Sequence, residues 1–188
     1  MPRSTRPKSQ TGIYHVMLRG INRQQIFIDD EDKERFVETV KRFKKESCYE
    51  VYAYCLMNNH VHLLLKESSE SIGQVMKRIC GSYVYWYNRK YGRIGHLFQE
   101  RFRSEAVEDQ EYFLTVFRYI HQNPLKAGVS QSLEKWEWSS YHDYFGRRAF
   151  IADTGFILEL FSKDLNTARQ QLLGFINADS EDKCMDLD

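Results

Sequence analysis

Two segments with strand-like composition are separated by only two residues, and this spacing constrains the fold more than any other feature of the chain. Residues 49–57 (YEVYAYCLM) and 60–66 (HVHLLLK) are rich in β-branched, aromatic and aliphatic side chains, with Asn58 and Asn59 between them. A two-residue connection joins antiparallel strands, and asparagine tolerates the positive φ of a tight turn. The sequence therefore predicts an antiparallel hairpin near the middle of the chain.

The segments around this hairpin predict helices and two further strands. Alternating side chains predict strands at 12–20 and 103–108. Apolar residues at helical spacing, with acidic residues before two of the segments, predict helices at 29–45, 71–91 and 109–123. Pro124 is expected to end the last of these helices. The order strand, helix, hairpin, helix, strand, helix predicts an α+β fold with helices packed on an antiparallel sheet. After it, 136–145 is expected to be an aromatic loop and 156–176 to form one or two short helices.

Charge is distributed unevenly along the chain. The chain has 188 residues, of which 42% are hydrophobic, and this is enough for one domain with its own core. Residues 151–188 carry three basic and eight acidic side chains, whereas the rest of the chain carries 24 basic and 18 acidic ones. A basic body favours a polyanionic partner, although chance asymmetry of a solvated surface explains the split equally well. We expect a flexible basic arm at 1–11, a main domain at 12–148 and an acidic, helical extension at 149–188.

The cysteines and the apolar runs bear on the compartment. The four cysteines are far apart and form no CxxC pair, which argues against a zinc ribbon and a disulfide framework. No run approaches 18 apolar residues, and no apolar stretch of a secretory signal follows the basic N-terminal residues. These features predict a cytoplasmic protein without a membrane partner.

His60 and His62 stand one residue apart on a predicted strand, so both side chains point to the same face. Two neutral imidazoles at this spacing can reach one divalent cation. Val61, Leu63 and Leu65 are then expected on the opposite, buried face. The alternative is a pair of structural or surface histidines, which is the commoner origin of this motif on a strand.

Tyr119 and Asn123 are four residues apart on a predicted helix and therefore share a face. A phenol is a covalent nucleophile when its oxyanion is stabilised near a metal, and an amide oxygen suits a hard cation such as Mg²⁺. The alternative is also plain: most of the twelve tyrosines must pack or lie on the surface, and Asn123 can simply close a helix before a turn.

Three separated motifs occur in one order, NNHVHLLL, then GHLFQERFRSEAVEDQEYFLTVFRYIHQNPLKAG, then WEWSSYHDY. Together they resemble the single-tyrosine HUH transposases of the insertion-sequence type, with the greatest likeness to the REP-associated tyrosine transposases. The likeness extends from about Gly12 to Phe145. It implies the ferredoxin- or RRM-like fold of HUH nucleases and a catalytic domain at 12–148. The short C-terminal helical extension carries no motif of this family and is a departure from its pattern.

The resemblance also implies a function and roles for single residues. It implies metal-dependent cleavage and rejoining of single-stranded, hairpin-associated DNA through a 5′-phosphotyrosine intermediate, as in DNA transposition. Tyr119 is then the nucleophile, and His60, His62 and Asn123 hold Mg²⁺ or Mn²⁺. The residues expected to bind DNA are Arg19, Arg23, Arg101, Arg103 and Arg118. A monomer is expected, with a dimer as the alternative.

The sequence leaves three other functions open. The first is a nucleic-acid-binding regulator that keeps the fold without cleavage, although binding alone has no need of a nucleophile. The second is an RRM-like RNA binder, although the aromatic motif of that module is absent from the predicted central strands. The third is a zinc hydrolase, although no HExxH motif is present.

Overall fold

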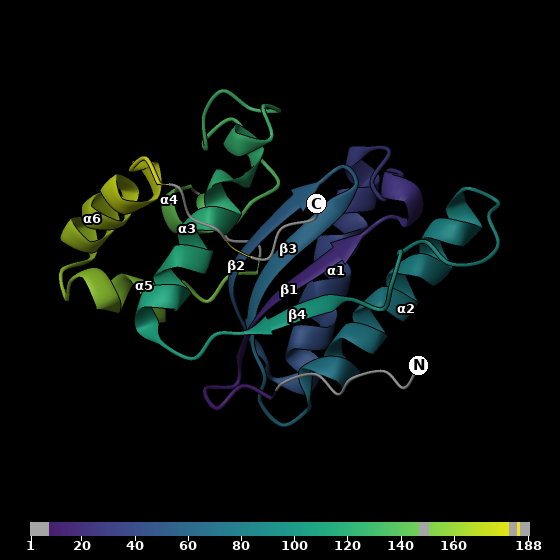
Figure 1. Cartoon of the computed structure of the whole chain (residues 1–188), viewed down its shortest axis with the longest axis horizontal. Coiled ribbons are helices and arrows are strands. Elements are labelled where there is room, and N and C mark those ends of the chain that lie inside the picture. The colour runs from purple at the N-terminus through teal and green to yellow at the C-terminus, as the bar shows by residue number, and fades with distance from the viewer. Residues whose placement is uncertain (1–7, 147–150, 181–183, 185–188) are drawn as a thin grey trace.

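The computed structural model describes residues 8–146, 151–180 and 184, and it contains a four-stranded antiparallel sheet in the order β2-β3-β1-β4 (Figure 1). The strands are β1 (Ile13–Arg19), β2 (Glu50–Met57), β3 (His60–Lys66) and β4 (Arg103–Ala106). β2 and β3 pair antiparallel across Asn58 and Asn59, which confirms the predicted hairpin. Because helices pack on this sheet, the α+β fold class is confirmed as well.

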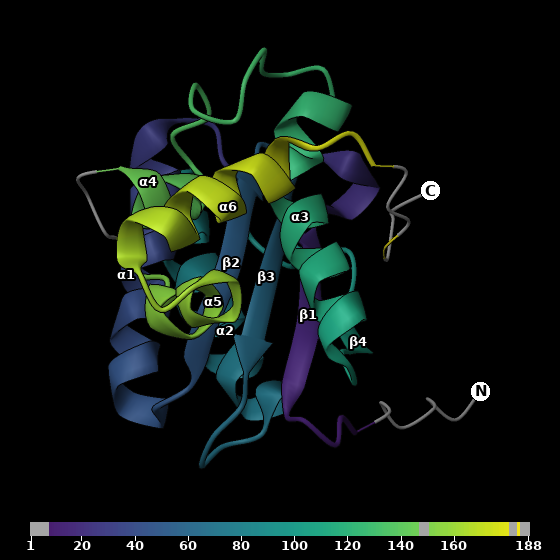
Figure 2. The ribbon, with the colours of Figure 1, turned by 90° about the vertical axis from the view of Figure 1, so that its left-hand side faces the viewer.

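Helices cover both faces of the sheet. One face packs on α1 (Asp30–Ser47) and α2 (Ile72–Lys90), and the other packs on α3 (Gln110–Lys126). The helices α5 (Thr154–Phe161) and α6 (Leu165–Asn177) lie beside α3 on the same face and form the C-terminal helical extension (Figure 2). Phe156 of α5 packs against Tyr52 of β2. Each face of the sheet therefore has its own apolar core.

The alternation along β3 determines which side chains enter which core. Val61, Leu63 and Leu65 belong to the core under α1 and α2, as predicted. Leu64 belongs to the core under α3, so His60 and His62, which share its parity, face α3. The site described below thus lies between the sheet and a single helix.

The turn between β2 and β3 is held by hydrogen bonds from distant residues. Neither Asn58 nor Asn59 has a positive φ, so this part of the prediction is wrong. The carbonyl of Asn58 accepts hydrogen bonds from the backbone N–H groups of Ile26 (2.8 Å) and Phe27 (3.0 Å), and that of Asn59 accepts one from Gly20 (2.9 Å). The segment after β1, which includes the short 3-10 helix Ile21–Arg23, therefore supports the turn.

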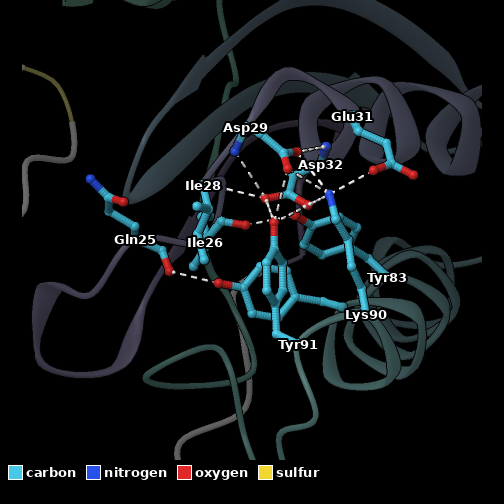
Figure 3. Close-up of polar contacts among 10 residues, drawn as sticks. Gln25, Ile26, Ile28, Asp29, Glu31, Asp32, Tyr83, Lys90 and Tyr91 are labelled. Carbon is cyan, nitrogen blue, oxygen red and sulfur yellow. Dashed lines mark hydrogen bonds and ion pairs between the residues drawn. The ribbon is translucent and has the colours of Figure 1, made fainter.

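A polar network joins the start of α1 to the end of α2 (Figure 3). The Lys90 ammonium lies 2.8 Å from both Asp29 and Glu31 and 2.9 Å from the fully buried Asp32. The Tyr91 hydroxyl donates to the same Asp32 carboxylate. Partial burial alone would lower the pKa of Lys90, but hydrogen bonds to the three carboxylates outweigh burial and raise it.

The aromatic segment 136–145 covers the outer edge of β2. The N–H of Leu56 donates to the carbonyl of Trp138 (2.8 Å), and the N–H of Ser140 donates to that of Tyr54 (2.9 Å). The segment then ends in the short helix α4 (Tyr141–Phe145), which corrects the expectation of a loop throughout. A covered edge is protected from pairing with a strand of another chain.

Pro124 does not end α3, which continues to Lys126, so the predicted end of this helix is wrong. A proline removes one hydrogen bond to the carbonyl four residues earlier. In the last turn of a helix this is the main cost, so α3 can continue past Pro124. The N–H of Ala127 donates to the carbonyl of Asn123 (2.9 Å) and closes the helix.

Parts of two predictions fall outside the described residues. Residues 1–7 of the basic arm expected at 1–11 and the expected boundary between 148 and 149 lie there. Of the remaining arm, the backbone N–H of Gln10 bonds to Glu108 and the Thr11 hydroxyl donates to the carbonyl of Val107. Across the described part of the chain, no helix is both long enough and apolar enough to cross a membrane.

Candidate active site

His60 and His62 lie under α3, in neighbouring positions of one sheet face. His62 pairs in register with Cys55 of β2 and Met17 of β1, and it is 1% exposed. His60 lies nearer the end of the sheet, opposite Arg19, and is half-buried. The two ring centroids are 5.1 Å apart and the rings are almost perpendicular. The sheet therefore holds one imidazole in the interior and the other at the rim.

The Nε2 atoms of the two imidazoles face the side-chain amide of Asn123 on α3. The distance from His60 Nε2 to Asn123 Oδ1 is 3.1 Å, and the distance from His62 Nε2 to Asn123 Nδ2 is 3.5 Å. The Nδ1 atoms face other partners, which are Asn59 Oδ1 at 2.7 Å for His60 and His15 Nε2 at 3.0 Å for His62. The partners at Nδ1 thus fix the orientation of both rings, so that Nε2 of each ring is directed at Asn123.

This donor set fits a divalent cation. Both ring nitrogens of His60 face amide oxygens, Nδ1 that of Asn59 and Nε2 that of Asn123 at 3.1 Å, so in a neutral His60 one nitrogen lone pair faces an oxygen acceptor. Two facing acceptors need a proton or a cation between them. Two imidazoles and an amide oxygen are also ligands that Mn²⁺ and Mg²⁺ accept. Within residues 8–146, 151–180 and 184, no metal-binding group of three or more His, Cys, Asp or Glu side chains occurs.

Burial keeps His62 in the neutral form. Burial lowers the pKa of His62 well below its ordinary value, and the neighbouring imidazoles of His15 and His60 lower it further. Metal binding requires a neutral imidazole. His62 therefore stays in the ligand-competent form throughout the neutral pH range.

Tyr119 lies one helical turn before Asn123 and packs against the same histidines. It is 4% exposed, and its ring meets the rings of His62 and His15 edge-on, with centroids 5.5 and 6.0 Å apart. The Lys126 ammonium lies 5.6 Å from the centre of the Tyr119 ring. The four residues proposed from the sequence as nucleophile and metal ligands thus come together within one chain.

Three of the predicted DNA-binding arginines gather beside the histidines. Arg19 lies opposite His60 and Arg103 opposite Met17, so both share the face of the histidine pair. Burial lowers the pKa of Arg19, as do the charges of Arg23 and Arg103. Neither Arg23 nor Arg103 forms an ion pair with a described residue, so two of the three guanidinium groups have no carboxylate partner in this part of the chain.

The other two predicted arginines lie elsewhere. Arg101 is exposed in the segment that leads into β4, two residues after Gln99, whose N–H bonds to the carbonyl of Arg19 (2.8 Å). The Arg118 guanidinium lies 4.5 Å from the centre of the Phe175 ring on α6. Arg101 is therefore an exposed residue close in sequence to this strand edge, whereas Arg118 faces the C-terminal helices.

The sequence alone did not indicate that His15 contacts His62 or that Asn59 is a hydrogen-bond partner of His60. His15 has the same parity along β1 as Arg19, which was a signal that it faces the same side of the sheet. Its contact with His62 depends on β1 pairing with β3, and no local pattern predicts which strands are neighbours.

His121, between Tyr119 and Asn123 in sequence, is not part of this cluster. Its Nδ1–H donates to the carbonyl of Phe117 (2.8 Å), and its Nε2 lies 2.9 Å from the Ser140 hydroxyl. Burial lowers the pKa of His121 to about 4. This imidazole is a buried structural group that connects α3 to the segment covering β2.

The chain is similar to known transposases in sequence. The family model described as "Transposase IS200 like" matches residues 8–123. A REP-associated tyrosine transposase of Haemophilus influenzae is 23% identical over 137 residues, which cover 62% of this chain and 77% of the relative. Its counterpart from Escherichia coli K12 is 22% identical over 148 residues, which cover 78% of this chain and 85% of the relative.

The fold is similar to that of a solved structure. A REP-associated tyrosine transposase bound to a REP hairpin superposes with a TM-score of 0.66 and 18% identity. The match covers 78% of this chain and 87% of that one. At this identity the likeness concerns the fold, and it confirms the sheet with its flanking helices.

Proposed function

The chain belongs to the IS200-like transposase family, and from this premise we propose that it cleaves and rejoins single-stranded DNA beside a hairpin through a 5′-phosphotyrosine bond on Tyr119. The observation that carries the proposal is the convergence of Tyr119, His60, His62 and Asn123 between α3 and the sheet. A protein that only binds DNA has no need of this arrangement.

In the cleavage step, the hydroxyl oxygen of Tyr119 attacks the phosphorus of a phosphodiester. The P–O3′ bond breaks, the 5′-phosphate becomes joined to Tyr119, and the phenol proton ends on the departing 3′ oxygen. In the joining step, a 3′-hydroxyl attacks the phosphotyrosine and releases Tyr119 with its proton. Each step exchanges one phosphate ester bond for another, so no ATP is required.

Two imidazoles and one amide prepare the site for this chemistry. His60 and His62 present Nε2, and Asn123 presents its side-chain oxygen, so these three groups would hold Mg²⁺ or Mn²⁺. Such an ion supplies Lewis-acid polarisation of the scissile phosphate. Lys126, whose ammonium lies 5.6 Å from the centre of the Tyr119 ring, adds positive charge near the proposed nucleophile.

The DNA itself is expected at the arginine-rich end of the sheet. Arg19, Arg23 and Arg103 lie next to the histidine pair, and arginine pairs with phosphate through two parallel hydrogen bonds. A hairpin is the proposed substrate because the structural relative is described as bound to a REP hairpin. Since the nucleophile and the histidines meet within one chain, a monomer suffices for cleavage.

Covalent capture tests the proposal. Purified protein is incubated with Mn²⁺ and a labelled single-stranded oligonucleotide taken from hairpin repeats beside its own gene, and the products are separated on a denaturing gel. We expect a slowly migrating adduct that Tyr119→Phe abolishes, while the native-gel shift of the same oligonucleotide persists. Tyr85→Phe is the matched control because Tyr85 is 69% exposed and lies on α2, which packs on the opposite face of the sheet, so its adduct should remain.

The double variant His60→Ala with His62→Ala tests the metal part separately. It should lose the adduct and its dependence on Mn²⁺ together, and Tyr119→Phe should still bind the metal. A native shift without any adduct in the parent protein would favour the regulator that binds without cleaving. An adduct that persists in Tyr119→Phe would assign the nucleophile to another residue.

A further inference from the structure

A third histidine stands behind the proposed metal ligands. His15 of β1 is fully buried, and its Nε2 lies 3.0 Å from Nδ1 of His62. The two rings are nearly parallel, with an interplanar angle of 28° and centroids 5.2 Å apart. Because His62 is itself 1% exposed, the contact lies in the interior, where water does not compete for these ring nitrogens.

The surrounding contacts decide which nitrogen of His62 carries the proton. The Asn123 Nδ2 group is a donor and lies 3.5 Å from His62 Nε2, so Nε2 presents its lone pair there. The proton of neutral His62 would then reside on Nδ1 and be donated to Nε2 of His15, and neutral His15 would carry its own proton on Nδ1. A cation bound by His62 Nε2 requires the same lone pair and hence the same tautomer.

We propose that His15 is a positioning residue that holds His62 in the Nδ1–H tautomer, with Nε2 open toward Asn123. This inference rests on the proposed function in so far as His62 is a metal ligand. Without an acceptor at His15, the buried Nδ1–H of His62 is left unsatisfied, which favours moving the proton to Nε2. A proton on Nε2 occupies the lone pair that the metal needs.

Two other roles for His15 fit the geometry less well. Its Nε2 is directed at His62 Nδ1, whereas both ligand nitrogens face Asn123, so His15 is not a third ligand. Its relation to Tyr119 is an edge contact between rings, with centroids 6.0 Å apart, whereas its contact with His62 joins two nitrogens at hydrogen-bonding distance.

The tautomer can be read directly in the metal-free protein. Nitrogen NMR of the imidazole rings distinguishes a protonated nitrogen from one with a free lone pair. We expect the proton of His62 on Nδ1 in the parent protein and on Nε2 in His15→Phe, which keeps an aromatic ring but has no acceptor. His15→Gln supplies an amide oxygen as an acceptor and should restore the Nδ1–H form. A parent protein with the proton on Nε2 would overturn the inference.

Calorimetric titration with MnCl₂ alone gives a second readout. Loss of an outer partner of a metal-binding histidine commonly weakens metal binding by about 10- to 100-fold, and we expect a loss of this size in His15→Phe. His15→Gln should recover most of the affinity. If His15 were only a packing residue, His15→Phe would change the melting temperature while the tautomer and the Mn²⁺ affinity stayed as in the parent.

The two proposals fail in different ways. If the parent binds Mn²⁺, the double His60→Ala and His62→Ala variant does not, and His15→Phe binds as the parent does, the role of His15 is refuted while the metal site stands. If the parent binds no Mn²⁺ and forms no adduct, the proposed function fails, and the tautomer of His62 still decides the role of His15. Should His15→Phe fail to fold, the tautomer in the parent and in His15→Gln decides the inference.

Discussion

At the scale of single residues, partners decide what a buried histidine does. His62 and His121 are both enclosed by the protein, and burial lowers the pKa of each. Both nitrogens of His121 have protein partners, Phe117 and Ser140, whereas Nε2 of His62 is directed at the side-chain amide of Asn123. The same side chain is therefore structural in one place and a candidate ligand in the other.

His121 makes folding stability depend on pH below neutrality. Its pKa is about 4 in the folded protein, against 6.5 for an ordinary histidine, so between these values the unfolded chain binds a proton that the folded protein does not. The free energy of unfolding must then decrease as the pH falls from 6.5 toward 4, by up to about 1.4 kcal/mol per pH unit. Urea unfolding at pH 7.5 and pH 4.5 measures this decrease.

The variant His121→Gln should show a decrease smaller than that of the parent protein by about 1 to 3 kcal/mol, because glutamine does not titrate. His96→Gln is the control, since His96 is exposed and its replacement should leave the decrease as it is in the parent. An equal decrease in the parent and in His121→Gln would contradict the assignment.

At the scale of elements, the site depends on contacts that lie away from it. The segment after β1 supports the turn that precedes His60, and the network around Lys90 holds the start of α1, which follows this segment, against the end of α2 (Figure 3). On the other side, the Gln122 side chain donates to the carbonyls of Ile176 and Ala178, both at 2.9 Å, and so ties α3 to the end of α6. Both the sheet side and the helix side of the site are thus braced.

Lys90→Met should destabilise the protein by about 2 to 4 kcal/mol, because it leaves the fully buried Asp32 carboxylate without its cation. Chemical denaturation at pH 7 measures the loss. The control is Lys41→Met on the exposed side of α1, which forms no ion pair with a described residue and should change stability by less than about 0.5 kcal/mol. Similar losses in the two variants would show that the network contributes little.

At the scale of the whole molecule, the two faces of the sheet differ in the polarity of their side chains. The face under α1 and α2 is apolar along β3, with Val61, Leu63 and Leu65 in one core. The face under α3 is apolar toward α5 and α6 and becomes polar and basic at the end where His60 and Arg19 lie. Both faces therefore contribute an apolar core, and the rim of the face under α3 also carries the residues of the proposed DNA site.

Salt dependence tests the arginine-rich end. If Arg19 and Arg103 contact phosphates, replacing each by glutamine should weaken hairpin binding and reduce the slope of log K against log salt by about 0.7 per lost contact on single-stranded DNA. Fluorescence anisotropy at several salt concentrations measures the slope. Arg169→Gln on α6 is the control, because Arg169 is exposed on the C-terminal extension. An unchanged slope in Arg19→Gln and Arg103→Gln would place the DNA elsewhere.

Local patterns were sufficient for the features that depend on one element or on one short connection. The two-residue spacing predicted the hairpin, the alternation of β3 predicted the faces of its side chains, and helical spacing placed Tyr119 and Asn123 on one face. Where local rules failed, distant contacts outweighed them. The turn at Asn58 and Asn59 has no positive φ because backbone groups of other segments hold its carbonyls.

The sequence by itself therefore determined the fold class, the order of the elements and the residue types able to carry the chemistry. Only the tertiary structure decided that β1 lies beside β3, which places His15 behind His62, and that Arg118 faces α6 while Arg19 and Arg103 face the histidines. The physical reason is that periodicity and turn chemistry act between residues close in sequence. The neighbour of a strand, in contrast, is selected by the packing of the whole chain, whose contacts join residues about fifty positions apart such as His15 and His62.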